Sequence, residues 1–198
     1  LGVDLAAIDH DHNSNIWIGG NVPFGFLQVY DPKENKSIIS FDFDLTGILD
    51  IQVLDSLAFV LFQDGQDFGI MKFLYNDGWE YRDSFRNFPE LAGSINCFLA
   101  NDSTLFIGTD YGIYLGNLSE NLKDPNRWQA IDDAMDFEVT SATFNDSFIA
   151  FSSKTSLYEL SILSGNWEAI TFSYSFSNIS EIIVSKNVYW IIDHKKLY

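Results

Sequence analysis

The chain repeats itself, and this repeat constrains its fold more than any other feature of the sequence. The segment "SNIWIGG" (14–20) aligns without a gap with "STLFIGT" (103–109), and "NDSTLFIGTDYGIY" (101–114) aligns in the same way with "NDSFIAFSSKTSLY" (145–158). The aligned anchors of the five copies are Ser14, Ser56, Ser103, Ser147 and Asn187. Successive anchors are 42, 47, 44 and 40 residues apart. A period in the forties with strand-like content is typical of a β-propeller, in which each blade has four strands.

Each copy has the same order of elements. A first strand such as "SINCFLA" (94–100) ends in a polar turn that suits a hairpin, and a second strand such as "NIWIGG" (15–20) follows. The second strands are apolar at successive positions, whereas a sheet with one solvated face would alternate. A blade between two neighbours is covered on both faces, so the pattern favours stacked blades. The sequence therefore predicts an all-β chain that forms a β-propeller, with a β-sandwich as the alternative.

The repeat predicts four complete four-stranded blades and a partial fifth within a single propeller fragment, 1–198. We expect the blades at about 3–46, 47–92, 93–138, 139–178 and 179–198. In the complete blades an aromatic residue marks the fourth strand, and we expect it to pack between blades because large aromatic side chains dominate cores. These residues are Phe41, Trp79, Trp128 and Trp167.

The fifth copy reaches Tyr198, which aligns with Tyr114, before a fourth strand can form. Propellers hide their strand edges and blade faces by closing into a ring. We therefore expect that the polypeptide continues beyond Tyr198 by at least two more blades, or that another chain completes the ring.

Charge and composition argue against several classes of function. The 28 acidic and 11 basic residues give a formal net charge of −17, which disfavours binding to nucleic acid or to anionic membrane surfaces. The longest apolar run without a charge, "SLAFVLFQ" (56–63), is far too short to span a bilayer. Cys97 is the only cysteine, so no internal disulfide is possible, and its apolar context predicts a buried thiol.

Two weak metal sites can be read from the sequence. In "DHDHNSN" (9–15), His10 and His12 are two residues apart and are expected to share one face of a strand, but zinc usually requires a third protein ligand. The remaining histidine is His194, in the incomplete copy. We therefore expect no transition metal at His10 and His12.

The second candidate is "DFDLTGILD" (42–50), whose spacing resembles that of a calcium-binding loop. Its candidate ligands are Asp42, Asp44, Thr46 and Asp50, at loop positions 1, 3, 5 and 9. Position 12 is Val53, where a bidentate carboxylate should close the coordination shell. We therefore interpret the segment as an acidic turn between blades and expect no calcium.

The sequence contains no motif of nucleophilic, zinc-dependent or nucleotide-dependent catalysis, and it predicts no catalytic residue and no cofactor. Two classes of function stay open. One is non-catalytic binding of a protein, or of a small or carbohydrate ligand, at a propeller face. The other is an enzyme of the glycosidase or polysaccharide-lyase kind, which needs paired carboxylates beside exposed aromatic rings. The long connections 83–93 and 117–128 are the expected contact region for a partner.

Two stretches carry a resemblance to a known family. "DHNSNIWIGG" (11–20) and "LFIGTDYGIY" (105–114) resemble the two-component-regulator propeller repeat, D-x-x-G-N-[IL]-W-[IV]-G-T followed by G-[IL]-x-x-[YF]. Ser14 stands where that family has glycine, Gly20 replaces its threonine, and the copies at 55 and 145 lack its tryptophan. The resemblance extends over nearly the whole chain. It implies a propeller that is the sensory or scaffold part of a bacterial envelope or secreted protein, with a periplasmic or extracellular location.

Overall fold

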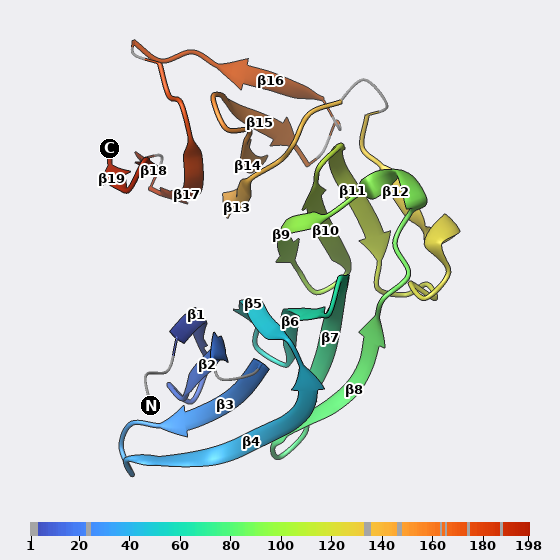
Figure 1. The fold of residues 1–198 in the computed structure, drawn as a ribbon, viewed down its shortest axis with the longest axis vertical. Coiled ribbons are helices and arrows are strands. Elements are labelled where there is room, and N and C mark those ends of the chain that lie inside the picture. Colours follow the sequence, from blue (N-terminus) through green and yellow to red (C-terminus); the bar gives the residue numbers. More distant parts are fainter. Residues whose placement is uncertain are drawn as a thin grey trace. The chain divides into compact units, whose positions relative to one another are not determined.

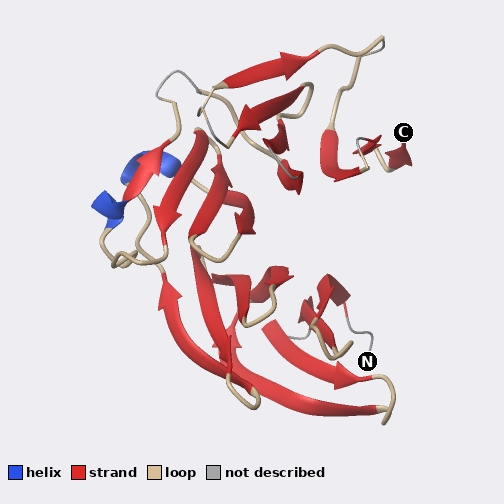
Figure 2. Ribbon diagram, turned by 180° about the vertical axis from the view of Figure 1, so that it is seen from behind, coloured by secondary structure: helices blue, strands red, loops and turns tan. Residues whose placement is uncertain are grey.

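A computed structural model describes residues 4–22, 25–132, 136–145, 148–162, 164, 166–173, 175–186 and 188–198. Within these ranges the side chains of residues 22, 42, 43 and 91 lie outside the description. The described part consists of strands with two single-turn 3-10 helices, η1 (Glu90–Ala92) and η2 (Pro125–Arg127) (Figure 2).

The strands form five sheets, here called blades 1 to 5, which Figure 1 shows in chain order. Blade 1 comprises β1 (Asp4–His10), β2 (Ile16–Val22), β3 (Gly25–Asp31) and β4 (Lys36–Leu45). Blade 2 comprises β5 (Gly47–Val53), β6 (Leu57–Asp64), β7 (Asp67–Tyr75) and β8 (Trp79–Phe85). Blade 3 comprises β9 (Ile95–Ala100), β10 (Thr104–Thr109), β11 (Gly112–Asn117) and β12 (Trp128–Ala130). Blade 4 comprises β13 (Ser141–Asn145), β14 (Phe148–Ser152), β15 (Leu157–Ser161) and β16 (Trp167–Ile170). Blade 5 comprises β17 (Ile179–Ser185), β18 (Val188–Asp193) and β19 (Lys196–Leu197).

Within each blade the order of the strands in space follows their order in the chain, as short hairpin connections require. Four blades have four strands and the fifth is partial. The fold is therefore a β-propeller, which confirms the fold class expected from the repeat.

The blades belong to two compact units. Unit 1 comprises Leu1–Phe88 with Ala100–Ser103 and Asn121–Asp124. Unit 2 comprises Pro89–Leu99, Thr104–Glu120 and Pro125–Tyr198.

The core of unit 1 lies between blades 1 and 2 and is centred on Trp17 of β2, which is fully buried. Its ring centroid lies 5.5 Å from that of Phe73 and 5.1 Å from that of Trp79, both in edge-to-face geometry. Gly19 allows the close approach of blade 2, because a Cβ atom at this position would lie 2.3 Å from Cγ2 of Ile48.

In unit 2, apolar clusters of described residues lie on both sides of blade 4. The first joins blade 4 to blade 3 and contains Phe151, Val139 and Cys97, whose thiol is buried as the sequence predicts. The second joins blade 4 to blade 5 through Ala150 and Ile191. Both faces of blade 4 are therefore covered, which explains the continuous apolar runs in its sequence.

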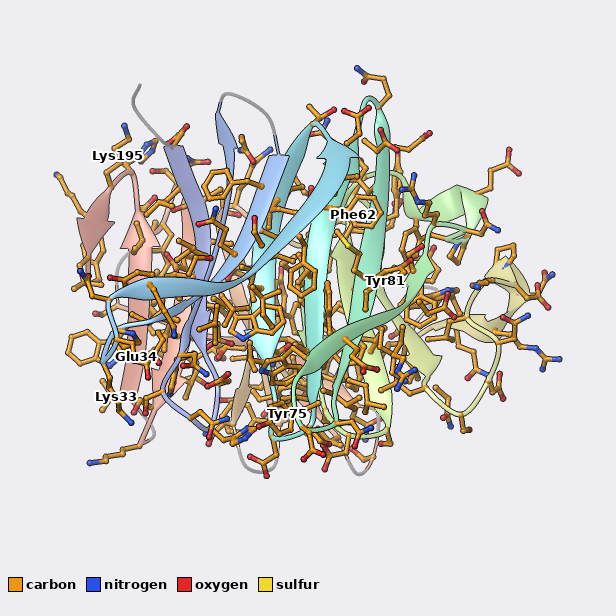
Figure 3. All side chains as sticks on the ribbon, turned by 90° about the horizontal axis from the view of Figure 1, so that it is seen from below. Lys33, Glu34, Phe62, Tyr75, Tyr81 and Lys195 are labelled. Carbon is orange, nitrogen blue, oxygen red and sulfur yellow. The ribbon has the colours of Figure 1, made fainter. Side chains whose placement is uncertain are left out.

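Three aromatic residues of the fourth strands, Phe41, Trp79 and Trp167, lie in or against these cores, as expected, and the fourth, Trp128, is buried. Trp79 is also buried, and Phe41 and Trp167 are partly buried against the clusters of their units. Polar residues occupy the turns instead. Figure 3 shows Lys33 and Glu34 at the turn between β3 and β4, where both side chains are exposed.

The acidic segment 42–50 is not a turn, which corrects the interpretation made from the sequence. Asp44 lies in β4, Asp50 lies in β5, and Thr46 is the only residue between the two strands. The backbone of Asp42 also lies in β4, while its side chain is outside the described residues. The Thr46 hydroxyl accepts a hydrogen bond from the Gly65 amide (2.8 Å). Blade 1 therefore passes into blade 2 almost directly, and the acidic side chains lie on strands.

Candidate functional site

Unit 1 has an open pocket of about 440 Å³. Its lining residues include His10 and His12, the two histidines that the sequence analysis considers as metal ligands. The pocket is formed by the turns that follow the first strands of blades 1, 2 and 3, so equivalent turns of three successive repeats meet at one place. Its lining residues are Asp9, His10, Asp11, His12, Val53, Leu54, Asp55 and Asp102.

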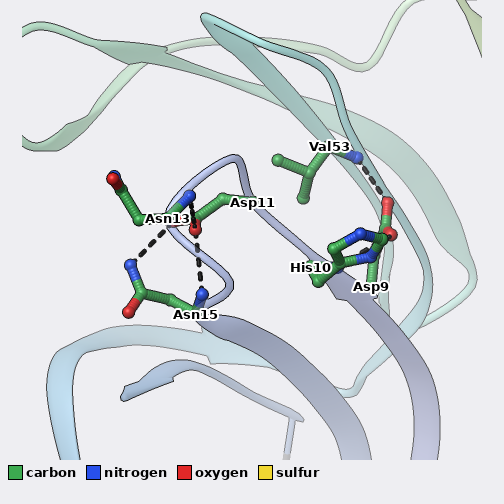
Figure 4. Close-up of polar contacts among 6 residues, drawn as sticks. All are labelled: Asp9, His10, Asp11, Asn13, Asn15 and Val53. Carbon is green, nitrogen blue, oxygen red and sulfur yellow. Dashed lines mark hydrogen bonds and ion pairs between the residues drawn. The ribbon is translucent and has the colours of Figure 1, made fainter. Parts of the chain in front are cut away.

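Asp11 holds the turn of blade 1 together. Its side chain is only 3% exposed, and its carboxylate accepts hydrogen bonds from the backbone amides of Asn13 (2.9 Å) and Asn15 (3.0 Å). It also accepts hydrogen bonds from Asn15 Nδ2 (3.0 Å) and from Trp79 Nε1 (2.9 Å) (Figure 4 shows the asparagine contacts). Burial acts to raise the pKa of Asp11, but these hydrogen bonds outweigh it, and the pKa lies below its ordinary value. The carboxylate is thus a charged structural anchor.

This turn corrects the placement of the histidines. β1 ends at His10, so His12 lies in the turn and the two side chains do not share a strand face. The physical reason is the Asx-type turn that begins at Asp11, together with a positive φ of 66° at Ser14. Both imidazoles are exposed and line the same pocket, His10 from the end of β1 and His12 from the turn that follows it.

Each histidine has its own neighbours. His10 Nδ1 lies 3.5 Å from Oδ1 of Asp9 (Figure 4). The His12 ring packs edge-on against Tyr75 with a centroid distance of 4.6 Å, and its Nε2 atom lies 3.0 Å from Nδ2 of Asn13. His194 is in the β18–β19 turn of unit 2. Among the described residues, no three or more His, Cys, Asp and Glu side chains are grouped so that they could hold a metal ion.

Asp9 lines the pocket and also joins two strands. Its Oδ2 atom accepts a hydrogen bond from the Val53 amide (2.6 Å) and its Oδ1 atom accepts one from the His10 amide (2.8 Å), as Figure 4 shows for Val53. Asp9 therefore links β1 to β5, and its carboxylate is already used by the fold.

Asp55 and Asp102 differ from these two carboxylates. Both are exposed, and neither forms a hydrogen bond or an ion pair with another described residue. Each stands directly before an anchor serine of the repeat, Ser56 or Ser103. Sequence reasoning did not single them out, although the repeated Asp-Ser pair was a usable signal. The carboxylates of Asp55 and Asp102 are therefore available to bind a ligand in the pocket.

The charged residues that line the pocket are all acidic. Its lining includes four aspartates and neither lysine nor arginine, and it has no aromatic residue other than the two imidazoles. Such a lining attracts a cationic group and offers no ring on which a sugar could stack.

The two long connections contact each other within unit 1. Lys123 Nζ lies 2.7 Å from Oδ1 of Asp83, and Asn87 Nδ2 donates a hydrogen bond to the Lys123 carbonyl (3.0 Å). Neither connection contributes a lining residue to the pocket.

No known family model matches the chain, and no curated protein sequence matches it. Solved structures do. PorZ, a bacterial surface component of the type-IX secretion system of Porphyromonas gingivalis, is similar with a TM-score of 0.70 and 17% identity, over 98% of this chain and 31% of PorZ. The AfRom2 CNH domain has a TM-score of 0.67 and 10% identity, over 98% and 69% of the two chains. A chain of the mitotic checkpoint complex has a TM-score of 0.67 and 10% identity, over 96% and 59%.

The fold is shared. At these identities the comparisons show the propeller alone, and the two-component-regulator repeat family is not confirmed by them. The chain spans about a third of PorZ and somewhat more than half of the checkpoint chain. No helix in the described part of the chain is long and apolar enough to cross a membrane.

Proposed function

We propose that this chain is a non-catalytic binding propeller that takes a protein partner at the pocket of unit 1. The group recognised there is a cationic side chain, lysine or arginine, on an exposed segment of the partner. The observation that carries the proposal is the pair Asp55 and Asp102, two exposed carboxylates without partners in a pocket that has no basic lining residue. Carboxylates in this state are available for charge-assisted hydrogen bonds.

The setting of the pocket supports the same function. It is built from short turns on a rigid sheet scaffold, the arrangement in which loops usually carry binding sites. The chain's formal charge of −17 adds a long-range attraction for a basic partner and speeds the encounter. The similarity to PorZ, described as a bacterial surface component, supports a location in the cell envelope or outside the cell, as does the resemblance of the repeat.

The carbohydrate enzyme is the second candidate, and the four aspartates of the pocket are the observation that favours it. A glycosidase needs one free carboxylate to protonate the leaving group and another to attack or to activate water. Asp9 and Asp11 are held by backbone amides and by Trp79, so they could not easily take either part. The lack of an aromatic platform in the lining also favours binding over sugar hydrolysis.

The test is a titration of the intact chain with a fluorescent peptide rich in lysine and arginine, followed by anisotropy. The double variant Asp55→Asn with Asp102→Asn removes both free carboxylates and leaves the turns in place. Exposed ion pairs contribute about 0.2–1 kcal/mol each, so we expect binding to weaken by about fivefold.

The matched control is Asp44→Asn with Asp67→Asn, which changes the net charge by the same amount. Both of these side chains are exposed, and both lie at the ends of β4 and β7 that are remote from the pocket turns. We expect less than about a twofold change for this control, because diffuse attraction is screened by salt. Equal weakening in the two double variants would show that the peptide binds to the overall charge and not to the pocket.

A further inference from the structure

Two blades have one apolar face that is exposed. On blade 5, Ile183, Val188 and Trp190 are 51%, 50% and 47% exposed, and Ile183 pairs directly with Trp190 across the β17–β18 ladder. On blade 1, Leu5 and Ile8 are 56% and 67% exposed. Exposed apolar faces of this kind mark interaction surfaces.

A blade between two neighbours has one face toward the blade that follows it and one face toward the blade before it. The repeat shows which of these two faces is exposed in blade 5 and which in blade 1. Trp17, Phe106 and Ala150 occupy the same position of the second strand, three residues after the anchor. Each packs on the blade that follows: Trp17 contacts Phe73 of blade 2, Phe106 contacts Phe144 of blade 4, and Ala150 belongs to the cluster with blade 5. We call this side of a blade its leading face. Trp190 stands at the same position in blade 5, so the exposed face of blade 5 is a leading face.

The opposite side of each blade is here called the trailing face, and it packs on the blade before. It carries the next residue of the second strand: Val60 in the cluster with blade 1, Phe151 in the cluster with blade 3, and Ile191 in the cluster with blade 4. In blade 1 this residue is Ile18, which pairs with Ile8. The exposed face of blade 1 is therefore a trailing face. The two exposed faces are the two complementary halves of the interface that the chain builds between neighbouring blades.

Charge adds a second complementarity. On the blade 1 side, Asp4 of β1 is exposed and residues 1–32 contain no lysine or arginine, whereas the carboxylates of Asp9 and Asp11 are bonded to blade 2. Residues 186–198 contain three lysines and one aspartate, in a chain that is otherwise strongly acidic. Opposite charges on two surfaces guide them into the correct encounter.

We propose that the chain associates head to tail with a second copy of itself, the leading face of blade 5 in one copy packing on the trailing face of blade 1 in the other. The contact reproduces a blade-to-blade interface, with Trp190 in the place that Trp17 has in unit 1. It is heterologous, since different surfaces meet, so association continues beyond two copies unless the geometry closes a ring. This proposal does not depend on the function proposed for the pocket.

The experiment is analytical ultracentrifugation of residues 1–198 over a wide range of concentration, in enough salt to screen the repulsion between copies that each carry a charge of −17. We expect the mean mass to rise above the monomer value of 22.5 kDa as the concentration increases. Trp190→Ser and Ile8→Ser should each raise the dissociation constant by at least about tenfold, as expected for anchors at the centre of an interface.

Two controls keep the test specific. Tyr111 (55% exposed) lies in the turn between β10 and β11 and Ile162 (44% exposed) lies in the turn after β15, so Tyr111→Ser and Ile162→Ser should associate like the original chain. Circular dichroism of every variant verifies that it is folded.

The decisive measurement mixes the two interface variants in equal amounts. The Trp190→Ser copy keeps an intact trailing face and the Ile8→Ser copy keeps an intact leading face, so one good interface can form between them. We expect each variant alone to stay monomeric and the mixture to form a complex of two copies that grows no further. A wild-type chain of monomer mass at every concentration, or a mixture that stays at monomer mass, would overturn the proposal.

Discussion

The Asp9 carboxylate and the Val53 amide, 44 residues apart in sequence, are joined by a hydrogen bond of 2.6 Å between the first strands of blades 1 and 2. Gln52 makes the equivalent connection to blade 3. Its Oε1 atom accepts a hydrogen bond from the Ala100 amide (2.6 Å), and its Nε2 atom donates one to the Ala100 carbonyl (3.3 Å). Val53 and Ala100 occupy the same position of the repeat. In unit 1 the first strands of blades 1 and 2 therefore each use a polar side chain to hydrogen-bond to the backbone of the first strand of the following blade.

The first prediction concerns this connection. Asp9→Ala leaves the partly buried Val53 amide without its acceptor, and we expect the free energy of unfolding to fall by about 1–2 kcal/mol. Asp9→Asn keeps an oxygen at the same place and should cost less than half as much. Urea denaturation followed by circular dichroism measures both. Equal losses for the two variants would mean that the charge, and not the acceptor, stabilises the strands.

The second prediction concerns pH. The pKa of Asp11 is lower in the folded chain than its ordinary value of 3.8, so the folded state binds its proton less readily than the unfolded state. The resulting stability is fully present above pH 3.8 and is lost as the pH falls through the folded pKa. We expect the urea midpoint to drop steeply below about pH 4. Asp11→Asn, which cannot titrate, should show a shallower drop over the same range, and parallel curves for the two proteins would contradict this assignment.

The third prediction tests the bond between Asp11 and Trp79. The indole Nε1 atom donates to Oδ2 at 2.9 Å in a buried setting, although the two residues are 68 positions apart. Trp79→Phe removes the donor and keeps an aromatic ring near Trp17. In a double-mutant cycle with Asp11→Ala, which removes the acceptor, we expect a coupling of about 1 kcal/mol or more. Losses that add within about 0.3 kcal/mol would show that the two side chains act independently.

The sequence predicted the blades because apolar periodicity is a local signal. The runs "LAFVLF" and "FIAFSS" already indicate strands covered on both faces, and blades 2 and 4 contain them as β6 and β14. The acidic segment at Thr46 was misread because spacing alone cannot distinguish a loop that binds a cation from two strands joined by one residue.

The pocket was harder to predict for a different reason. Asp11 looks like any solvated turn residue, and only the approach of Trp79 from another blade makes it a buried anchor. Asp55 and Asp102 lie in separate repeats, and the stacking of blades brings their turns to one pocket. Contacts of this kind depend on the relative placement of blades, which no local pattern specifies.

The last prediction uses Cys97 as a probe of unit 2. Its buried thiol should react with a disulfide reagent only when the surrounding cluster opens, so native protein should label slowly and denatured protein at once. A substitution at Gly108 should change how often the cluster around Cys97 opens. A Cβ atom there would lie 2.5 Å from the Cys97 sulfur and 2.7 Å from Cγ1 of Val139, so Gly108→Ala must displace both atoms or the strand itself.

Overpacking of this kind costs about 1–3 kcal/mol, and since about 1.4 kcal/mol corresponds to a factor of ten, labelling of Gly108→Ala should accelerate by about 5- to 140-fold. Gly78→Ala is the matched control, because its Cβ atom would have no other atom within 4 Å and it lies in unit 1. Its labelling rate should stay close to that of the original chain. Equal acceleration in both variants would show that Cys97 is exposed by unfolding of the whole chain, and that the close approach at Gly108 does not control the opening of unit 2.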